Sequence, residues 1–122
     1  MATQSDLAAV FDRLKPLLQQ CAAGLIVTED GPAGYSLNTQ FSERWKKELY
    51  FGAVLIKKNY VSYYLMPVYM YPDLLDGISP ALRKRMQGKS CFNFAVIDDV
   101  LFTELAALTE SCLQRCRAEK TV

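Results

Sequence analysis

The decisive stretch of the sequence is YFGAVLIKKNYVSYYLMPVYMY, at residues 50–71. It holds six of the seven tyrosines of the chain. A polar segment interrupts it at Lys57, Lys58 and Asn59, and asparagine tolerates the left-handed backbone that a tight hairpin turn requires. We therefore expect residues 50–71 to form a long β-hairpin that turns at 57–59.

Side chains alternate between the two faces of a strand, and this divides the hairpin residues into two sets. On the first strand, one face is predicted to carry Tyr50, Gly52, Val54 and Ile56, and the other Phe51, Ala53 and Leu55. On the return strand, Tyr60, Ser62, Tyr64 and Met66 alternate with Val61, Tyr63 and Leu65. Neither face is polar, which favours central strands with both faces at least partly covered. Only one face must pack on helices, so the second aromatic face is the best candidate for a binding surface.

Amphipathic helices are predicted at both ends of the chain. Ser5 is predicted to cap the first helix, which would run to Gly24 with a kink at Pro16. Its apolar residues recur with a helical period: Leu7, Val10, Phe11, Leu14, Leu17, Leu18 and Cys21. Asp98 or Asp99 is predicted to cap the last helix. The inward residues of that helix are expected to be Leu101, Leu105, Leu108, Cys112, Leu113 and Cys116.

Shorter elements lie between these helices. β-Branched content and turn residues predict strands at 25–29 and 35–39, then a polar excursion over 40–48 around Trp45, and a last strand at 90–96. Pro72 and Ser79-Pro80 are predicted to open two short helical segments. Strands joined by short turns are antiparallel. The expected fold is α+β, one domain over residues 1–122: a two-layer sandwich whose antiparallel sheet of about five strands is covered on one face by the N- and C-terminal helices.

Composition narrows the function classes. The 122 residues carry a formal net charge of +1, which argues against a nucleic-acid-binding protein. The chain has no histidine, the commonest general base and metal ligand, and its four cysteines lack the spacing of a disulfide framework. We see neither a signal peptide nor an apolar run of the roughly 20 residues that span a bilayer. We therefore expect a cytoplasmic protein with reduced thiols and no membrane segment.

Two segments resemble the YdhG-like family of small bacterial domains of unknown function. They are LIKKNYVSYY at residues 55–64 and QGKSCFNF at residues 87–94, which are similar to the family hairpin and its last strand. The resemblance implies a fold similar to that of frataxin, and it raises intracellular iron handling as an alternative function. Frataxin-type iron binding uses clustered carboxylates of the first helix and the adjoining strand edge. The acidic residues here would be Asp6, Asp12, Glu29 and Asp30, mixed with Arg13 and Lys15.

The leading hypothesis is a non-enzymatic binding domain. Its candidate ligand-binding residues combine the aromatic face with nearby cations: Tyr60, Tyr64, Met66, Lys57, Arg83, Lys89 and Ser90. Tyrosine and methionine, here Met66 and Met70, suit a ligand groove, and cations suit a carboxylate or phosphate. The expected partner is a small anionic or aromatic ligand or another protein, with a homodimer through the same surface as a further alternative. Core tyrosines and solvated cations are the ordinary interpretation of the same residues.

Residue groups that could carry chemistry are weaker candidates. Cys112 and Cys116 share a helix face and Cys21 could approach them, but without histidine or a Cys-x-x-Cys knuckle they are expected to be core residues. Asp98 and Asp99 are expected to belong to a helix cap rather than to an acid–base pair. Serine and cysteine nucleophiles lack the histidine that usually activates them. No catalytic residue, metal ligand or cofactor is therefore expected.

Overall fold

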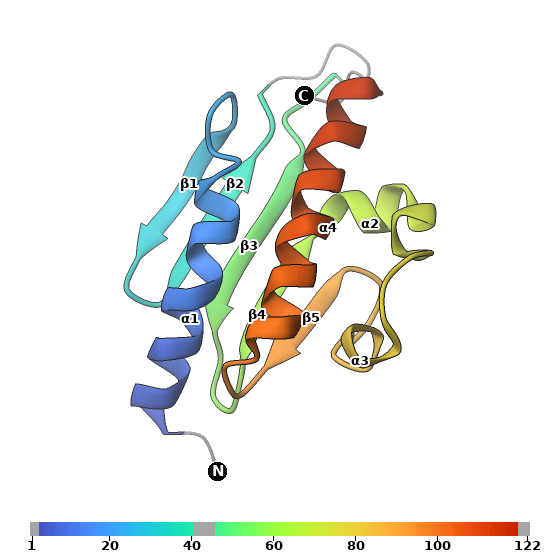
Figure 1. The fold of residues 1–122 in the computed structure, drawn as a ribbon. Helices are drawn as coiled ribbons and strands as arrows, with labels where there is room; N and C mark the ends of the chain where they lie inside the picture. Colours follow the sequence, from blue (N-terminus) through green and yellow to red (C-terminus); the bar gives the residue numbers. More distant parts are fainter. Residues whose placement is uncertain (1–2, 41–45, 120–122) are drawn as a thin grey trace.

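The computed structural model describes residues 3–40 and 46–119. The elements follow in the order α1 (Gln4–Gln19), β1 (Ile26–Gly31), β2 (Gly34–Asn38), β3 (Tyr50–Ile56), β4 (Val61–Leu65), α2 (Met66–Met70), a 3₁₀ helix (Pro72–Leu75), α3 (Pro80–Arg83), β5 (Cys91–Phe94) and α4 (Asp99–Ala118). The five strands form one antiparallel sheet in the order β1-β2-β3-β4-β5. α1 and α4 lie side by side on one face of this sheet (Figure 1). The predicted α+β two-layer sandwich is therefore confirmed.

The hydrophobic core fills the space between the two long helices and the sheet face that they cover. The inward residues predicted for α4 are all buried, as expected from their helical period. The sheet contributes, among others, Val54, Val61, Tyr63, Leu65 and Phe92. Val54 pairs with Tyr63, and Tyr63 pairs with Phe92, so these residues share one face. The return strand therefore turns its predicted apolar set toward the helices.

A β-bulge in β3 changes the face of two aromatic residues. Leu37 pairs with Gly52, but the next residue, Asn38, pairs with Tyr50, so the pairing skips Phe51. Phe51 is fully buried in the core, and Tyr50 points to the opposite, second face of the sheet. The predicted alternation is therefore wrong at Tyr50 and Phe51, because the extra residue shifts the period of the strand.

The predicted hairpin is correct as far as Leu65 and wrong beyond it. Residues Met66–Met70 form α2 instead of continuing the strand. Pro67 lies in the first turn of α2, where its missing N–H is not needed, whereas in a strand it would remove a ladder hydrogen bond. Leu65 pairs with Gly52, directly beside the bulge, so the regular ladder with β3 also ends there. Tyr69 and Tyr71 consequently lie beside the sheet and not within it.

The first helix begins and ends at other residues than predicted. Thr3 is the N-cap in place of Ser5: the Asp6 N–H donates to Thr3 Oγ1 at 3.1 Å, and the Thr3 N–H donates to Asp6 Oδ2 at 3.0 Å. This capping box is favoured because it satisfies two backbone donors at once. α1 ends at Gln19, and Gly24 occupies the following turn with a φ of 83°. Pro16 lies inside α1 without ending it, as predicted.

The shorter elements follow the sequence closely. β1 and β2 occupy the two predicted strands with slightly shifted ends, and β5 is shorter than the predicted 90–96 strand. Ser79 caps α3, where the Leu82 N–H donates to Ser79 Oγ at 3.1 Å. Of the predicted excursion over 40–48, residues 41–45 with Trp45 lie outside the described residues. α2 and α3 lie on the β5 side of the molecule, where they frame the site described next (Figure 1).

Candidate functional site

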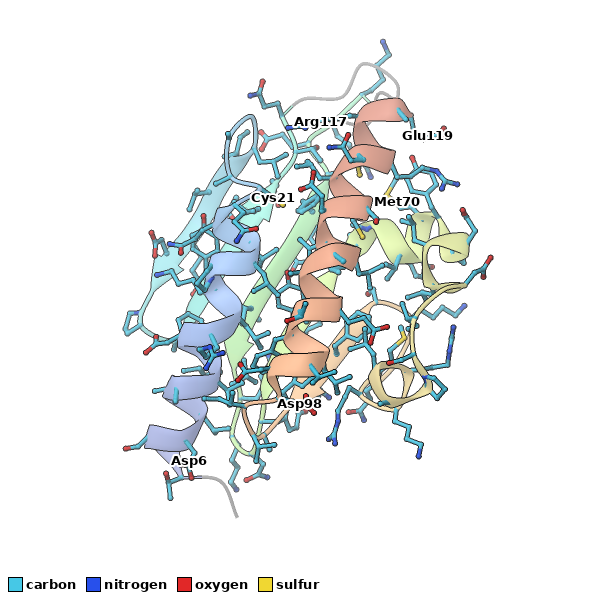
Figure 2. The ribbon with its side chains drawn as sticks, in the orientation of Figure 1. Asp6, Cys21, Met70, Asp98, Arg117 and Glu119 are labelled. Carbon is cyan, nitrogen blue, oxygen red and sulfur yellow. The ribbon has the colours of Figure 1, made fainter. Side chains whose placement is uncertain are left out.

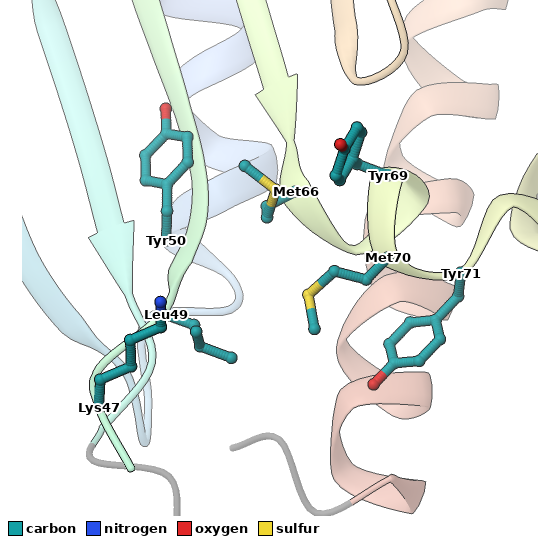
Figure 3. A pocket seen from close by; sticks show the side chains of 7 residues that line it. All are labelled: Lys47, Leu49, Tyr50, Met66, Tyr69, Met70 and Tyr71. Atoms are coloured by element: carbon teal, nitrogen blue, oxygen red, sulfur yellow. The ribbon is translucent and has the colours of Figure 1, made fainter. Parts of the chain in front are cut away.

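An aromatic cleft opens where β3 begins and α2 leaves the sheet. The described residues that line it are three tyrosines, two methionines, a leucine and a lysine: Tyr50, Tyr69, Tyr71, Met66, Met70, Leu49 and Lys47. Its volume is about 660 Å³. Figure 3 shows the side chains of Met66 and Met70 extending from α2 toward Leu49 and Tyr50. We call this concavity the aromatic cleft.

Two local departures from regular strand structure create the aromatic cleft. The bulge in β3 turns Tyr50 away from the core. Pro67 starts α2 at the point where the ladder ends, so the tyrosines that follow Leu65 no longer lie in the sheet. The walls of the cleft therefore come from residues that regular strands would have placed elsewhere.

A second cleft adjoins the aromatic cleft at Tyr69. Its volume is about 640 Å³. We call it the basic cleft, and its lining residues are Val68, Tyr69, Pro72, Leu75, Arg83, Met86, Gly88 and Lys89. Tyr69 is 56% exposed, and Lys89 Nζ lies 5.9 Å from the centroid of its ring. The two clefts are therefore neighbours that share one aromatic wall.

The basic cleft contains two cations, Arg83 and Lys89, that have no acidic partner in the part of the chain that the structure describes. Arg83 Nη2 donates to the Leu75 carbonyl at 2.8 Å. Within the described residues, neither Arg83 nor Lys89 forms an ion pair, and no carboxylate lines either cleft. Three cations of the helix layer are paired instead: Arg13 with Asp99, Lys15 with Asp30, and Arg115 with Asp73. The basic cleft therefore carries two positive charges that no lining carboxylate among the described residues compensates.

A shallow hollow of about 210 Å³ lies on the second face of the sheet. Its lining residues are Tyr60, Ser62, Tyr64, Gln87, Cys91 and Asn93. Ser62 Oγ donates to Asn93 Oδ1 at 2.7 Å, and Asn93 Nδ2 donates to Gln87 Oε1 at 2.8 Å. Because its polar groups already pair with one another and it is small, the hollow is a weaker binding site than the two clefts.

The structure does not bring the predicted ligand-binding residues into one site. They are divided among three concavities: Met66 in the aromatic cleft, Arg83 and Lys89 in the basic cleft, and Tyr60 and Tyr64 in the hollow. Lys57 lies in the hairpin turn, where its N–H donates to the Tyr60 carbonyl at 2.8 Å. Ser90 is half-buried, and its carbonyl accepts from the Leu65 N–H at 2.9 Å. The sequence therefore indicated members of each concavity without showing which of them belong together.

Tyr69 and Tyr71 are the most informative of the lining residues that were absent from the predicted site, which also lacked Lys47 and Leu49. Assigning residues 66–71 to the return strand hid the two tyrosines, because strand tyrosines were sorted by alternation alone. The available signal was Pro67, since proline is disfavoured in a central strand and favoured in the first turn of a helix. A break at Leu65 would have separated Tyr69 and Tyr71 from the sheet.

The hydroxyl of Tyr50 stays protonated at neutral pH. Burial raises its pKa, and the neighbouring Tyr64, Cys91 and Glu29 raise it further. Tyr50, which lines the aromatic cleft, therefore carries a neutral hydroxyl. Such a group can donate or accept a hydrogen bond but does not act as an anionic base.

The cysteines of the helix layer behave as core residues, as predicted. Cys21, Cys112 and Cys116 are buried, and Cys21 projects from the end of α1 (Figure 2). Burial raises the pKa of Cys21 and of Cys116 to about 11, and it raises the pKa of Cys112 as well. These thiols therefore stay protonated and pack as small apolar groups.

The adjacent carboxylates that open α4 are structural. Asp98 is the N-cap, and the Leu101 N–H donates to Asp98 Oδ1 at 3.1 Å (Figure 2). Asp99 forms an ion pair with Arg13. The interpretation of this pair as a helix cap is therefore confirmed for Asp98.

Two of the four acidic residues considered for iron, Asp6 and Asp30, already have structural partners. Asp6 belongs to the capping box of α1, and Asp30 accepts from Lys15 Nζ at 2.8 Å. Among the described residues, no group of three or more His, Cys, Asp or Glu side chains is placed to hold a metal ion. The geometry of the described acidic residues therefore gives the iron alternative no support of its own.

Comparisons with known proteins found no match to this chain. No family model, no curated protein and no solved structure matches the chain. The resemblance to the YdhG-like family stays a prediction. Within residues 3–40 and 46–119, none of the helices combines the length and the apolar character needed to cross a membrane.

Proposed function

We propose that this chain is a non-enzymatic binding domain that takes the flat, apolar ring system of a small molecule into the aromatic cleft. One observation carries the proposal: a cleft of about 660 Å³ is lined by three tyrosines, two methionines and a leucine. Ligand pockets typically have volumes of about 300–1,000 Å³ and are lined mainly by apolar and aromatic groups. The aromatic cleft meets both criteria.

The lining residues suit recognition of a ring system. Tyrosine rings offer flat surfaces for stacking, and methionine side chains adapt to the shape of a ligand. Tyr71 is also held in place, because the Arg115 guanidinium lies 4.9 Å from its ring centroid. Arg115 is in turn fixed by two hydrogen bonds to Asp73, at 2.8 and 2.9 Å. Part of the wall is therefore preorganised, which lowers the entropic cost of binding.

The chemistry of nearby groups supports binding over catalysis. The chain has no histidine. Burial raises the pKa of the Cys91 thiol, and Cys91 Sγ donates to Asn93 Oδ1 at 3.2 Å. Together with the neutral Tyr50 hydroxyl, this leaves no activated nucleophile among these groups at neutral pH.

Three alternative hypotheses concern a protein partner, a homodimer and iron handling. A protein partner or a second copy of this chain could use the surface around Tyr69, since an exposed aromatic group at the mouth of a cleft can anchor an interface. Frataxin-type iron handling follows only from the family resemblance, and a cytoplasmic location is likewise still a prediction. Sedimentation at several concentrations would separate a homodimer from a monomer.

The neutral fluorophore N-phenylnaphthylamine tests the proposal directly, because it becomes bright only in an apolar site. We expect saturable binding to the folded protein. Met70→Gln should weaken that binding about tenfold, since a polar amide replaces an apolar contact inside the cleft. Met86→Gln is the matched control, because Met86 is also half-buried but lines the basic cleft. Absence of binding, or equal binding by both variants and the wild type, would contradict the proposal.

A further inference from the structure

The two clefts differ in chemistry and share one wall. From this juxtaposition we infer that the ligand is an aromatic acid. Its ring system occupies the aromatic cleft, and its carboxylate, sulfonate or phosphate is held by Arg83 and Lys89 in the basic cleft. The inference rests on the proposed function and adds the charge of the ligand and a second subsite.

The charges of the basic cleft favour a negatively charged group. Its lining residues, as far as the structure describes the chain, are all apolar, neutral or cationic. No ion pair within the described part of the chain includes Arg83 or Lys89, so no carboxylate partner offsets these two cations in their concave site. A concave surface with low-dielectric walls strengthens the attraction between such cations and an anion. Charge complementarity therefore selects a negatively charged group.

The geometry of Arg83 favours an acidic group that offers two oxygens. Its Nη2 donates to the Leu75 carbonyl at 2.8 Å, which fixes the side chain between α3 and the 3₁₀ helix. A guanidinium has further N–H donors in one plane, and these match the two oxygens of a carboxylate or phosphate. A fixed guanidinium binds such a group with less loss of side-chain entropy than a freely moving one.

Tyr69 connects the two subsites. It lines both clefts, and Lys89 Nζ lies 5.9 Å from its ring centroid. A ligand ring in the aromatic cleft that contacts Tyr69 would therefore lie next to the residue over which Lys89 is placed. An acidic group attached to that ring can reach the basic cleft without a long linker, which favours a compact aromatic acid.

A nucleic acid fits this arrangement less well. Polyanion binding needs an extended positive surface, and the formal net charge of the whole chain is only +1. The two cations of the basic cleft are a local feature beside an apolar site. They match one acidic group better than a backbone of many phosphates.

A pair of dyes separates the two subsites. Anilinonaphthalenesulfonate and N-phenylnaphthylamine share one ring system and differ by the sulfonate. We expect the wild type to bind the sulfonate more tightly than the neutral dye. Added salt should weaken the binding of the sulfonate and leave that of the neutral dye unchanged, because only the former includes an ionic contact.

Substitution of the two cations gives the decisive measurement. The double variant Arg83→Gln/Lys89→Gln should bind the sulfonate about tenfold more weakly and the neutral dye as well as the wild type does. Lys57→Gln/Lys58→Gln is the matched control, because it removes the same charge at the exposed hairpin turn. The single variant Arg83→Lys should retain part of the affinity for the sulfonate, since it keeps the positive charge but not the planar fork of the guanidinium.

The outcomes distinguish this inference from the proposed function. If both dyes bind with equal affinity and the double variant changes neither, the second subsite is wrong and the aromatic cleft stands. If the hairpin control weakens the sulfonate as much as the cleft variant does, long-range charge explains the effect and the subsite is also wrong. If neither dye binds the wild type, the proposed function fails and the inference fails with it.

Discussion

Tyr63 and Tyr69 lie in the same short stretch of sequence but have opposite environments. Tyr63 lies under the helices and is 0% exposed, and its hydroxyl is 2.7 Å from Thr109 Oγ1, which donates to the Leu105 carbonyl at 2.8 Å. Tyr69 is 56% exposed and stands between two clefts beside Lys89. One tyrosine belongs to a closed, fully hydrogen-bonded core, and the other offers its ring to solvent.

The two regions that hold these tyrosines differ in the same way. In the helix layer, the residues of the core cluster are buried, and cations such as Arg13 and Lys15 are paired with aspartates. Around α2 and α3, apolar side chains line open clefts, and Arg83 and Lys89 have no acidic partner among the described residues. A sheet packed on long helices supplies stability. The region around α2 and α3 retains open apolar surface and two cations without a lining carboxylate among the described residues.

The largest expected effect contrasts the two tyrosines directly. Tyr63→Ala should lower the free energy of unfolding by about 3–5 kcal/mol, because it opens a cavity in the core and removes the partner of Thr109. Tyr69→Ala should lower it by less than about 1 kcal/mol, since the ring is largely exposed. Urea unfolding measures both. Similar losses for the two variants would mean that Tyr69 belongs to the core and would remove the contrast.

The second prediction concerns the point where the two regions meet. A Cβ on Gly52 would lie 2.7 Å from the Tyr64 carbonyl oxygen and 3.2 Å from a methyl group of Leu18. Gly52→Ala should therefore cost about 1–3 kcal/mol of unfolding free energy. Gly77→Ala is the control, because a Cβ there meets nothing within 4 Å, and its effect should stay within about 0.5 kcal/mol. A harmless Gly52→Ala would show that β3 and β4 are not this tightly paired.

The third prediction tests how α3 is attached to the helix layer. The Ser79 N–H and Oγ both donate to the Glu104 carboxylate at 2.6 Å. Glu104→Ala should cost about 1–2 kcal/mol of unfolding free energy and also weaken binding of the anionic dye, because α3 carries Arg83. Glu110→Ala, at another glutamate of α4 that is exposed, should change neither. If Glu104→Ala leaves dye binding unchanged, the contact between Ser79 and Glu104 does not position Arg83.

The smallest effect is a pH dependence at the 3₁₀ helix. Arg115 lowers the pKa of Asp73 below its ordinary value of 3.8 through a side-chain hydrogen bond. A carboxyl whose folded-state pKa is lowered stabilises the protein above its unfolded-state pKa, and this contribution is lost as the pH falls through the folded-state pKa. Acidification below 3.8 should therefore destabilise the wild type more than Asp73→Asn. Urea midpoints measured along the pH series would show this, and equal slopes for both proteins would refute it.

Several features of the fold could be predicted because they depend on local periodicity. The stripes of α1 and α4, and the alternation of Val61, Tyr63 and Leu65 in β4, follow directly from the 3.6- and 2-residue periods. Caps were less certain, because Thr3 and Ser5 are both good N-cap residues. The choice of Thr3 depended on Asp6, whose side chain completes the capping box.

The candidate site was predictable only in part. Met66, Arg83 and Lys89 were identified by residue type, but their division between two clefts depends on where β4 ends. Phe51 and Tyr50 exchanged faces because the strand pairs with β2 through a bulge, which the residue order of β3 does not reveal. Bulges are set by the partner strand and by the packing of both faces.

The sequence by itself determined the layers of this protein, since hydrophobic period and turn chemistry act within short segments of chain. It also placed six of the seven tyrosines in one stretch and left the chain without histidine. Pro67 marks the point after Leu65 where this stretch divides into a strand and a helix, but only the tertiary structure decided that Tyr50, Tyr69 and Tyr71 line one cleft. That grouping depends on the bulge in β3 and on the contact of α2 with β3, which join distant residues, so no local pattern could show which tyrosines lie together.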